Sequence, residues 1–186
     1  MALGHRPLND GPALRVAVIG PTNIQRVGAA AGIAPHVYID AAYEVGRQLA
    51  AGGHTLIVVP DRGVAVAAME AYLDEKGRHL VGICPSSGVS EPAAVLGISK
   101  WRDRCHEVVA DCSWYEQHHR IGVLSDRMVC VGLSCGTVAE LAWTKWTPGP
   151  SVALVRSTMS GLPPELMAEV SAELVELEDV ADWLVS

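Results

Sequence analysis

Short apolar runs recur along the chain, separated by segments of helical character. The runs are rich in β-branched residues, and most lack strict alternation of polar and apolar positions. Strands with this pattern are covered on both faces, as in a parallel sheet between two helix layers. The pattern predicts seven strands, at 15–20, 55–60, 80–85, 107–110, 128–133, 152–155 and 174–177.

The intervals between these runs have helical signals. Pro35 stands where a helix would start, and apolar residues then recur every four positions as far as Leu49, before Gly52 and Gly53 end the helix. Helices are predicted at 36–51, 63–76, 114–124, 137–146, 165–172 and 180–185. For 88–104 we expect a loop that contains a little helix.

Alternation of strands and helices predicts one α/β domain over 14–186, with a doubly wound, mainly parallel sheet of about seven strands and helices on both faces. Segment 1–13 is polar and lacks the apolar core of a signal peptide, so we expect a flexible leader. In such sheets, ligands bind beyond the carboxyl ends of the strands, where the strand order reverses. Three strand ends rich in turn residues are therefore the candidate site.

The charge balance narrows the range of partners. The chain has 186 residues, 49% of them hydrophobic, and a net charge of −7. A general surface for nucleic acid or acidic membranes needs an excess of Lys and Arg, so neither partner is expected. No apolar run approaches the roughly 18 residues of a membrane-spanning helix.

The cysteine count is odd, and no secretion signal precedes the cysteines. They are Cys84, Cys105, Cys112, Cys130 and Cys135. Reduced, mostly buried thiols in a cytoplasmic protein are expected. Neither CxxC nor HExxH spacing occurs, and the adjacent His118 and His119 would point apart on a helix. No metal site is predicted.

The first strand ends in small and polar residues, Gly20, Thr22 and Asn23. They would let the backbone approach a ligand, and either polar side chain could hydrogen-bond to it. An ordinary turn between strand and helix explains them equally well.

The second strand ends in Asp61, Arg62 and Gly63, ahead of a predicted helix. A helix N-terminus offers N–H donors to an anion, and Arg62 could contact phosphate in a bidentate way. Asp61 could cap the helix or bind a ribose hydroxyl. The alternative for this pair is a plain surface turn.

The fifth strand end carries the strongest candidate for a phosphate cradle. Its ligand-binding candidates are Gly132, Ser134, Cys135, Gly136 and Thr137. Thr137 and Glu140 also have capping-box spacing, which leaves Glu140 either as a cap partner or as a carboxylate facing the ligand.

Two further roles stay open near this segment. Cys135 near a helix N-terminus could be a nucleophile with His118 or His119 as base. Trp114 or Tyr115 could stack on a base, although core or interface packing is the default for the aromatic residues, including Trp143 and Trp146.

Three motifs resemble the Rossmann-like, lysine decarboxylase-like superfamily. They are VAVIGPTN at 16–23, Gly46 followed by LAAGGHT at 49–55, and VGLSCGTVAELA at 131–142. The superfamily includes cytokinin-activating phosphoribohydrolases and molybdenum-cofactor carrier proteins, and the order of units matches over roughly 14–185. The resemblance implies a Rossmann-like nucleotide-binding domain and a homodimer whose helices pack across a two-fold axis.

The phosphoribohydrolases have a Gly-Gly-x-Gly-Thr-x-x-Glu motif, which implies a phosphate cradle and a catalytic role for Glu140. Here the paired glycines are altered. Gapless alignment puts Gln117 where those enzymes have an Arg, and Arg120, one helical turn on, is the candidate to replace it in holding phosphate. Their Gly-Gly-x-x-Gly loop keeps only its last glycine, Gly63.

These matches and departures leave three functions open. The first is a binding or carrier protein for a phosphate-bearing nucleotide or pterin-type cofactor at the C-terminal edge of the sheet. The alternative is a phosphoribohydrolase that cleaves the N-glycosidic bond of a nucleoside 5′-monophosphate, and the third is a structural or regulatory member with a degenerate pocket. No cofactor is required by the sequence, and a nucleotide or the molybdenum cofactor is the candidate bound ligand.

Overall fold

A single all-parallel sheet organises the protein in the computed structural model, which describes residues 13–147 and 149–186. The strands are β1 (Arg15–Ile19), β2 (Thr55–Val58), β3 (His79–Ile83), β4 (Glu107–Val109), β5 (Arg127–Cys130), β6 (Ser151–Val155) and β7 (Ala172–Val175). Their order is β4-β3-β2-β1-β5-β6-β7, and every pair is parallel. The doubly wound α/β domain and all seven predicted strands are confirmed, while the predicted leader 1–13 lies almost wholly outside the described residues.

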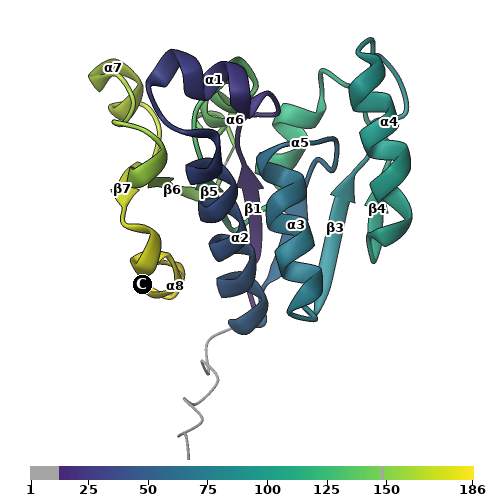
Figure 1. The fold of residues 1–186 in the computed structure, drawn as a ribbon, viewed down its shortest axis with the longest axis horizontal. Helices are drawn as coiled ribbons and strands as arrows, with labels where there is room; N and C mark the ends of the chain where they lie inside the picture. Colours follow the sequence, from purple (N-terminus) through teal and green to yellow (C-terminus); the bar gives the residue numbers. More distant parts are fainter. Residues whose placement is uncertain (1–12, 148) are drawn as a thin grey trace, which may run out of the picture.

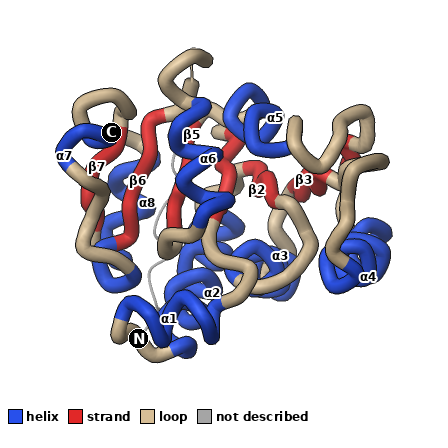
Figure 2. The backbone as a smooth tube through the Cα atoms, turned by 90° about the horizontal axis from the view of Figure 1, so that it is seen from above, coloured by secondary structure: helices blue, strands red, loops and turns tan. Residues whose placement is uncertain are grey.

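Helices cover both faces of the sheet (Figures 1 and 2). They are α1 (Ile24–Ala31), α2 (Pro35–Ala51), α3 (Val64–Asp74), α4 (Pro92–Trp101), α5 (Gln117–Leu124), α6 (Cys135–Trp143), α7 (Pro164–Met167) and α8 (Val180–Leu184), with 3-10 turns at Arg102–Arg104, Arg156–Thr158 and Leu177–Asp179. Seen from above in Figure 2, α1, α2 and α3 lie on one side, and α5 and α6 on the other.

The central strand β1 shows why the apolar runs are continuous. Val16 and Val18 pack into the core beneath α2 and α3, whereas Ala17 and Ile19 point into the core beneath α5 and α6. Successive side chains of a strand alternate between faces, so a strand buried on both sides must be apolar at every position.

Two helices differ from the sequence-based prediction. No helix was predicted at α1. Its N-cap is Asn23, whose side chain accepts a hydrogen bond from the Arg26 N–H, and its C-cap is Gly32 in the left-handed conformation. The expected loop at 88–104 instead contains the ten-residue helix α4. Its buried residues Ala94, Ile98 and Trp101 are spaced as one helix face.

Several predicted helix boundaries were also wrong, among them those of α5 and α7. Helix α5 begins at Gln117 and not at 114. Helix α7 ends at Met167, and Ala172, which was assigned to that helix, is the first residue of β7. None of the helices in the described part of the chain is long and apolar enough to cross a membrane.

The strand order reverses at β1. From there β2, β3 and β4 follow in one direction, and β5, β6 and β7 in the other. The loops that leave β1 and β5 therefore diverge to opposite sides of the sheet and open a crevice between them.

Candidate functional site

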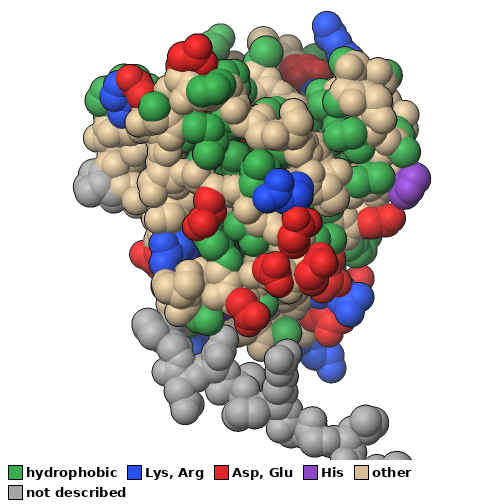
Figure 3. Space-filling view, turned by 90° about the vertical axis from the view of Figure 1, so that its left-hand side faces the viewer, with side chains coloured by type: hydrophobic (Ala, Val, Ile, Leu, Met, Phe, Trp, Pro, Cys, Tyr) green, Lys and Arg blue, Asp and Glu red, His purple; other side chains and the backbone are tan. Residues whose placement is uncertain are grey.

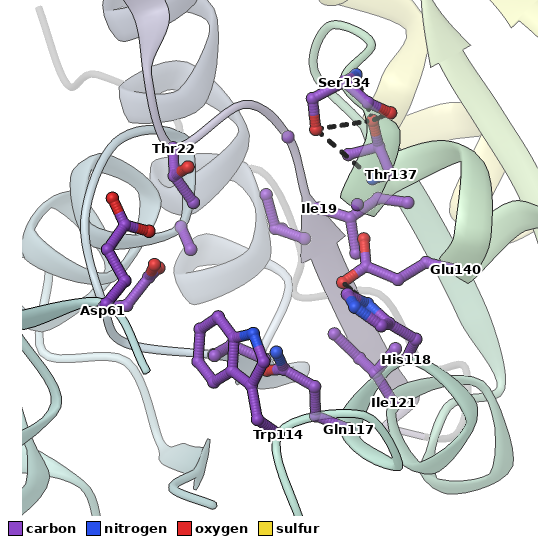
Figure 4. A pocket seen from close by; sticks show the side chains of 16 residues that line it. Ile19, Thr22, Asp61, Trp114, Gln117, His118, Ile121, Ser134, Thr137 and Glu140 are labelled. Atoms are coloured by element: carbon purple, nitrogen blue, oxygen red, sulfur yellow. Dashed lines mark hydrogen bonds and ion pairs between the residues drawn. The ribbon is translucent and has the colours of Figure 1, made fainter. Parts of the chain in front are cut away.

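A cavity of about 290 Å³ lies at this crevice, beyond the carboxyl ends of β1, β2 and β5. Figure 4 shows the side chains that face it: Thr22 and Asp61 on one side, Glu140 and His118 on the other, and Trp114 and Gln117 between them. Ile19, Val59 and Ile121 contribute apolar surface. The three predicted strand ends do meet, and α5 adds a wall that was not predicted.

The loop after β1 contributes Gly20 and Thr22 to the cavity. A Cβ on Gly20 would lie 2.4 Å from a Val64 side-chain carbon and 2.6 Å from the Val131 carbonyl oxygen, so only glycine lets the chain pass there. Asn23 is not a lining residue, because its side chain caps α1.

The loop after β2 brings the Asp61 carboxyl into the cavity wall, where the residue is only 4% exposed. Burial raises the pKa of Asp61 from 3.8 to about 6, and the Arg62 backbone N–H and guanidinium lower it only in part. Burial disfavours the ionised form of this carboxyl. Carboxyl groups with shifted pKa values are common at functional sites.

Arg62 and Gly63 have other roles. The Arg62 guanidinium pairs with the Glu91 carboxylate at 2.6 Å, outside the cavity wall. Gly63 has a φ of +68°, and the Val64 N–H that follows donates to the Pro21 carbonyl oxygen at 3.2 Å. That first amide of α3 is therefore already occupied, which weakens the predicted anion site at this helix.

The loop after β5 ends in a capping box that differs from the one considered from the sequence. Ser134 is the N-cap of α6: its hydroxyl accepts from the Thr137 N–H at 3.3 Å, and the Thr137 hydroxyl accepts from the Ser134 N–H. The proposed Thr137–Glu140 capping box is therefore wrong. Helix α6 starts two residues earlier than predicted, which releases Glu140 from any capping role.

This N-terminus leaves two amides for a ligand. Within the described residues, neither the Cys135 N–H nor the Gly136 N–H has a hydrogen-bond acceptor. Gly136 lines the cavity, and its missing side chain leaves the amide accessible. Such amides, together with the helix dipole, favour an anion.

Glu140 faces the cavity from the second turn of α6. It is 8% exposed, and its Oε1 lies 3.4 Å from Nδ1 of His118 on α5. Burial raises the pKa of Glu140, and the hydrogen bond and charge of His118 oppose this shift. Glu140 and His118 thus form a hydrogen-bonded pair in the cavity wall, where burial opposes the charge of the carboxyl.

Two candidates of the same segment lie outside the cavity wall. Cys135 is exposed and does not line the cavity, while His118 is directed to Glu140, so the structure does not assemble a Cys–His pair. Gly132 has a φ of +89°, and a Cβ there would lie 2.5 Å from the Tyr38 ring. Gly132 therefore shapes the loop, and the residues of this segment that line the cavity are Ser134, Gly136 and Thr137.

The other cysteines are mostly buried, and of the two aromatic candidates only Trp114 lines the cavity. All five cysteines are free, and Cys84, Cys112 and Cys130 are buried, as expected. Trp114 is half-buried and lines the cavity, whereas Tyr115 is 73% exposed.

The model of one family, described as the SLOG cluster4 family, matches residues 13–180 of this fold and so spans the whole site. The chain belongs to the SLOG cluster4 family. The lysine decarboxylase-like superfamily predicted from the sequence motifs is confirmed. No curated protein gives a significant match.

Two solved structures share the fold of this SLOG cluster4 protein. The molybdenum cofactor binding protein of Rippkaea orientalis superposes with a TM-score of 0.64 at 19% identity, over 93% of this chain and 96% of that one. The molybdenum cofactor carrier protein of Chlamydomonas reinhardtii gives a TM-score of 0.61 at 20% identity, with the same coverage of both chains. At such identities the likeness concerns the fold.

The position aligned with the superfamily's Arg, Gln117, lines the cavity of this SLOG cluster4 protein and is 2% exposed. Arg120 does not: its guanidinium pairs with the Asp111 carboxylate in a separate hollow formed with Cys112, Glu116 and His119. The predicted substitution of Arg120 for the missing Arg is not supported, since Asp111 holds it elsewhere.

Sequence reasoning missed two polar residues of the wall. Glu91 lies at the rim, ahead of α4, in the stretch for which a loop with a little helix was expected. Gln117 was considered only as a departure from a motif. No lining residue is Lys or Arg, so the SLOG cluster4 cavity combines carboxyl groups and an amide with one unoccupied helix N-terminus.

Proposed function

We propose that this protein binds a small phosphate-bearing ligand, a nucleotide or a pterin-type cofactor such as the molybdenum cofactor, in the cavity between β1 and β5. The observation that carries the proposal is the combination of the Gly136 amide, which has no acceptor within the described residues, with three buried polar groups, Asp61, Gln117 and Glu140, which no helix cap explains. The partner of Glu140, His118, itself lines the cavity. Buried polar groups without a structural role favour binding.

The size of the cavity supports a single small ligand. Its volume, about 290 Å³, is at the lower end of the roughly 300–1,000 Å³ typical of small-molecule sites. The molybdenum cofactor proteins that share the fold also support a carrier role. With no Lys or Arg in the wall, the phosphate would rest on the α6 amides, and the organic part would meet the carboxyl groups.

Two variants of the same shape that differ in charge test the phosphate position. Gly136→Asp places a carboxylate beside the α6 amides, whereas Gly136→Asn places a neutral group of the same shape. Both fit, since a Cβ at Gly136 has only ordinary contacts at 3.6 and 3.7 Å, and an acidic residue in the first turn favours the helix.

Titration calorimetry with ribose 5-phosphate and with adenosine and guanosine 5′-monophosphates is the measurement. Gly136→Asp should weaken binding about tenfold or more relative to Gly136→Asn. Equal affinities for the two variants would contradict the phosphate position. If no phosphate compound binds or shifts the melting temperature of the wild type, the structural or regulatory role takes precedence.

A second candidate function is hydrolysis of the N-glycosidic bond of a nucleoside 5′-monophosphate. The observation that favours it is Glu140, which is free of the cap, buried and in contact with His118, across the cavity from Asp61. In this reaction water adds to the anomeric carbon, the carbon–nitrogen bond breaks and the base leaves with a proton. A carboxylate stabilises the oxocarbenium-like transition state, and a protonated group supplies the leaving base.

This candidate predicts that the protein releases free base and ribose 5-phosphate from a nucleoside monophosphate. Glu140→Gln should reduce release at least about a hundredfold while the affinity for the nucleotide changes little. Chromatography of the free base is the assay, and Glu165→Gln, in the short helix α7 and outside the cavity wall, is the control. Binding without release would favour the carrier.

The resemblance also leads us to propose a homodimer. Trp143 and Trp146 are 42% and 67% exposed, and their ring centroids lie 6.0 Å apart at the end of α6, so they offer an apolar contact surface. Light scattering should show a dimer that Trp146→Lys dissociates. A wild-type monomer at all accessible concentrations would contradict this.

A further inference from the structure

The Gln117 side chain is polar, buried and without a partner. The residue is 2% exposed at the start of α5, and within the described residues its Oε1 has no hydrogen-bond partner. Buried carbonyl groups are nearly always hydrogen-bonded, because leaving one unpaired opposes folding. An unpaired one in a cavity wall therefore indicates a group that a ligand completes.

The surroundings of Gln117 favour a donor over an acceptor. Three other lining residues are carboxylic acids: Asp61, Glu140 and Glu91, of which Glu91 pairs with Arg62. No Lys or Arg side chain lines the cavity. An anionic or carbonyl-rich group placed among them would meet like charges or unpaired acceptors. The phosphate belongs at the α6 amides, and a group with N–H donors belongs beside Gln117.

Trp114 supplies a flat surface next to this amide. Its indole ring is half-buried and lines the cavity, and Figure 4 shows the ring beside the Gln117 side chain, on the same side of the cavity. Aromatic rings of ligands stack on such side chains, and stacking leaves the ring edge to be selected by hydrogen bonds.

We propose that Gln117 accepts a hydrogen bond from an exocyclic amino group on an aromatic ring that stacks on Trp114, so that the site selects amino-substituted rings over their oxo counterparts. The χ3 torsion of Gln117 has a broad energy minimum. The amide can therefore rotate so that Oε1 accepts a hydrogen bond from a donor in the cavity. This inference rests on the proposed function and deepens it, since amino groups of this kind occur in adenine, guanine and the pterins.

Matched ligands test the inference in the wild-type protein. Inosine 5′-monophosphate differs from the adenosine compound by an oxo group in place of an amino group, and lacks the amino group of the guanosine compound. We expect at least one amino nucleotide, or neopterin phosphate as the pterin arm, to bind about tenfold more tightly than inosine monophosphate by titration calorimetry. The arm that shows the preference identifies the ring.

Two variants assign the preference to Gln117. Gln117→Leu removes the acceptor at similar volume, and Gln117→Asn shortens it while keeping a polar group, so one informative variant remains if the other folds poorly. In either variant we expect the tenfold preference to fall to about twofold or less, with the affinity for ribose 5-phosphate unchanged. A structural role alone would weaken amino and oxo ligands equally.

The outcomes separate this inference from the proposed function. Binding of ribose 5-phosphate with equal affinities for amino and oxo nucleotides overturns the inference and leaves the phosphate site standing. A preference that survives both variants also overturns it. Failure of ribose 5-phosphate and of every nucleotide to bind overturns the proposed function and the inference together.

Discussion

Among the acidic residues of the cavity wall, Asp61 shows how the fold alters the chemistry of a side chain. Its pKa is raised from 3.8 to about 6 by burial, so between these values the folded protein holds more protons than the unfolded chain. Stability therefore falls as the pH rises from about 4 to about 6, and above that range the ionised carboxyl opposes folding by about 3 kcal/mol. Because the ionised Asp61 carboxyl lowers the stability of the fold, we expect it to serve ligand binding.

Replacing this carboxyl should stabilise the protein at neutral pH. Asp61→Asn keeps the shape and removes the charge, so we expect the free energy of unfolding to rise by about 1–3 kcal/mol at pH 8 and by only about a third as much at pH 4.5. Urea unfolding at the two values checks this, with the exposed Asp40→Asn as control. A similar gain at both pH values would show that burial of the charge is not the cause.

Glu140 shows why the site could be predicted only in part at this scale. The segment 134–140 satisfies capping-box spacing twice, once with Ser134 and Thr137 and once with Thr137 and Glu140. Local sequence cannot choose between the two, because the choice depends on where β5 ends and how α6 docks on the sheet. The structure ends β5 at Cys130 and starts α6 at Cys135, which leaves Glu140 for the cavity.

At the level of elements, α4 is the helix that completes the site. It packs directly on the loop after β2, where a Cβ on Gly97 would lie only 1.7 Å from the Asp61 carbonyl oxygen. Only a glycine permits this approach, which brings the preceding Glu91 to the cavity rim.

Adding a methyl group at this contact should push α4 away. Gly97→Ala is expected to reduce the free energy of unfolding by about 1–3 kcal/mol and to weaken ligand binding, because the Asp61 backbone must shift. Gly122→Ala is the matched control on α5: its Cβ would meet only the Thr147 hydroxyl, at 3.9 Å, so the better helix former should stabilise by about 0.5–1 kcal/mol. Both are measured by urea unfolding, and equal effects of the two substitutions would refute the close contact.

The strands were predictable for a physical reason that the short helices lack. The five inner strands, β1, β2, β3, β5 and β6, are buried on both faces, so their apolar runs are explicit in the sequence. Helix α1 has eight residues and depends on its Asn23 cap and Gly32 end, and α4 depends on its contact with the loop after β2. These are tertiary or end effects, and hydrophobic periodicity does not report them.

For the molecule as a whole, the strand order decides where the chemistry lies. The sequence supplies seven parallel strands, but the reversal at β1, with β5 as its neighbour, follows from how the helices pack on the two faces. The same topology places β7 at the edge, where Figure 3 shows acidic side chains gathered on the lower part of that face. Exposed acids there are Glu173, Glu176, Glu178, Asp179 and Asp182.

This acidic edge carries much of the net charge of −7 and blunts the open strand against pairing with another sheet. The negative net charge also agrees with the small-ligand proposal, because general binding to nucleic acid relies on an excess of Lys and Arg. We therefore expect the anion to bind at the N-terminus of α6, in a protein whose net charge is −7.

A crystal structure of the protein with guanosine 5′-monophosphate tests that claim most directly. We predict phosphate oxygens within hydrogen-bond distance, about 3 Å, of the Gly136 N–H, with the rest of the ligand in the cavity toward Trp114 and Gln117. A phosphate bound elsewhere, for example at Arg120, or a cavity filled by protein side chains with no ligand inside, would contradict the account.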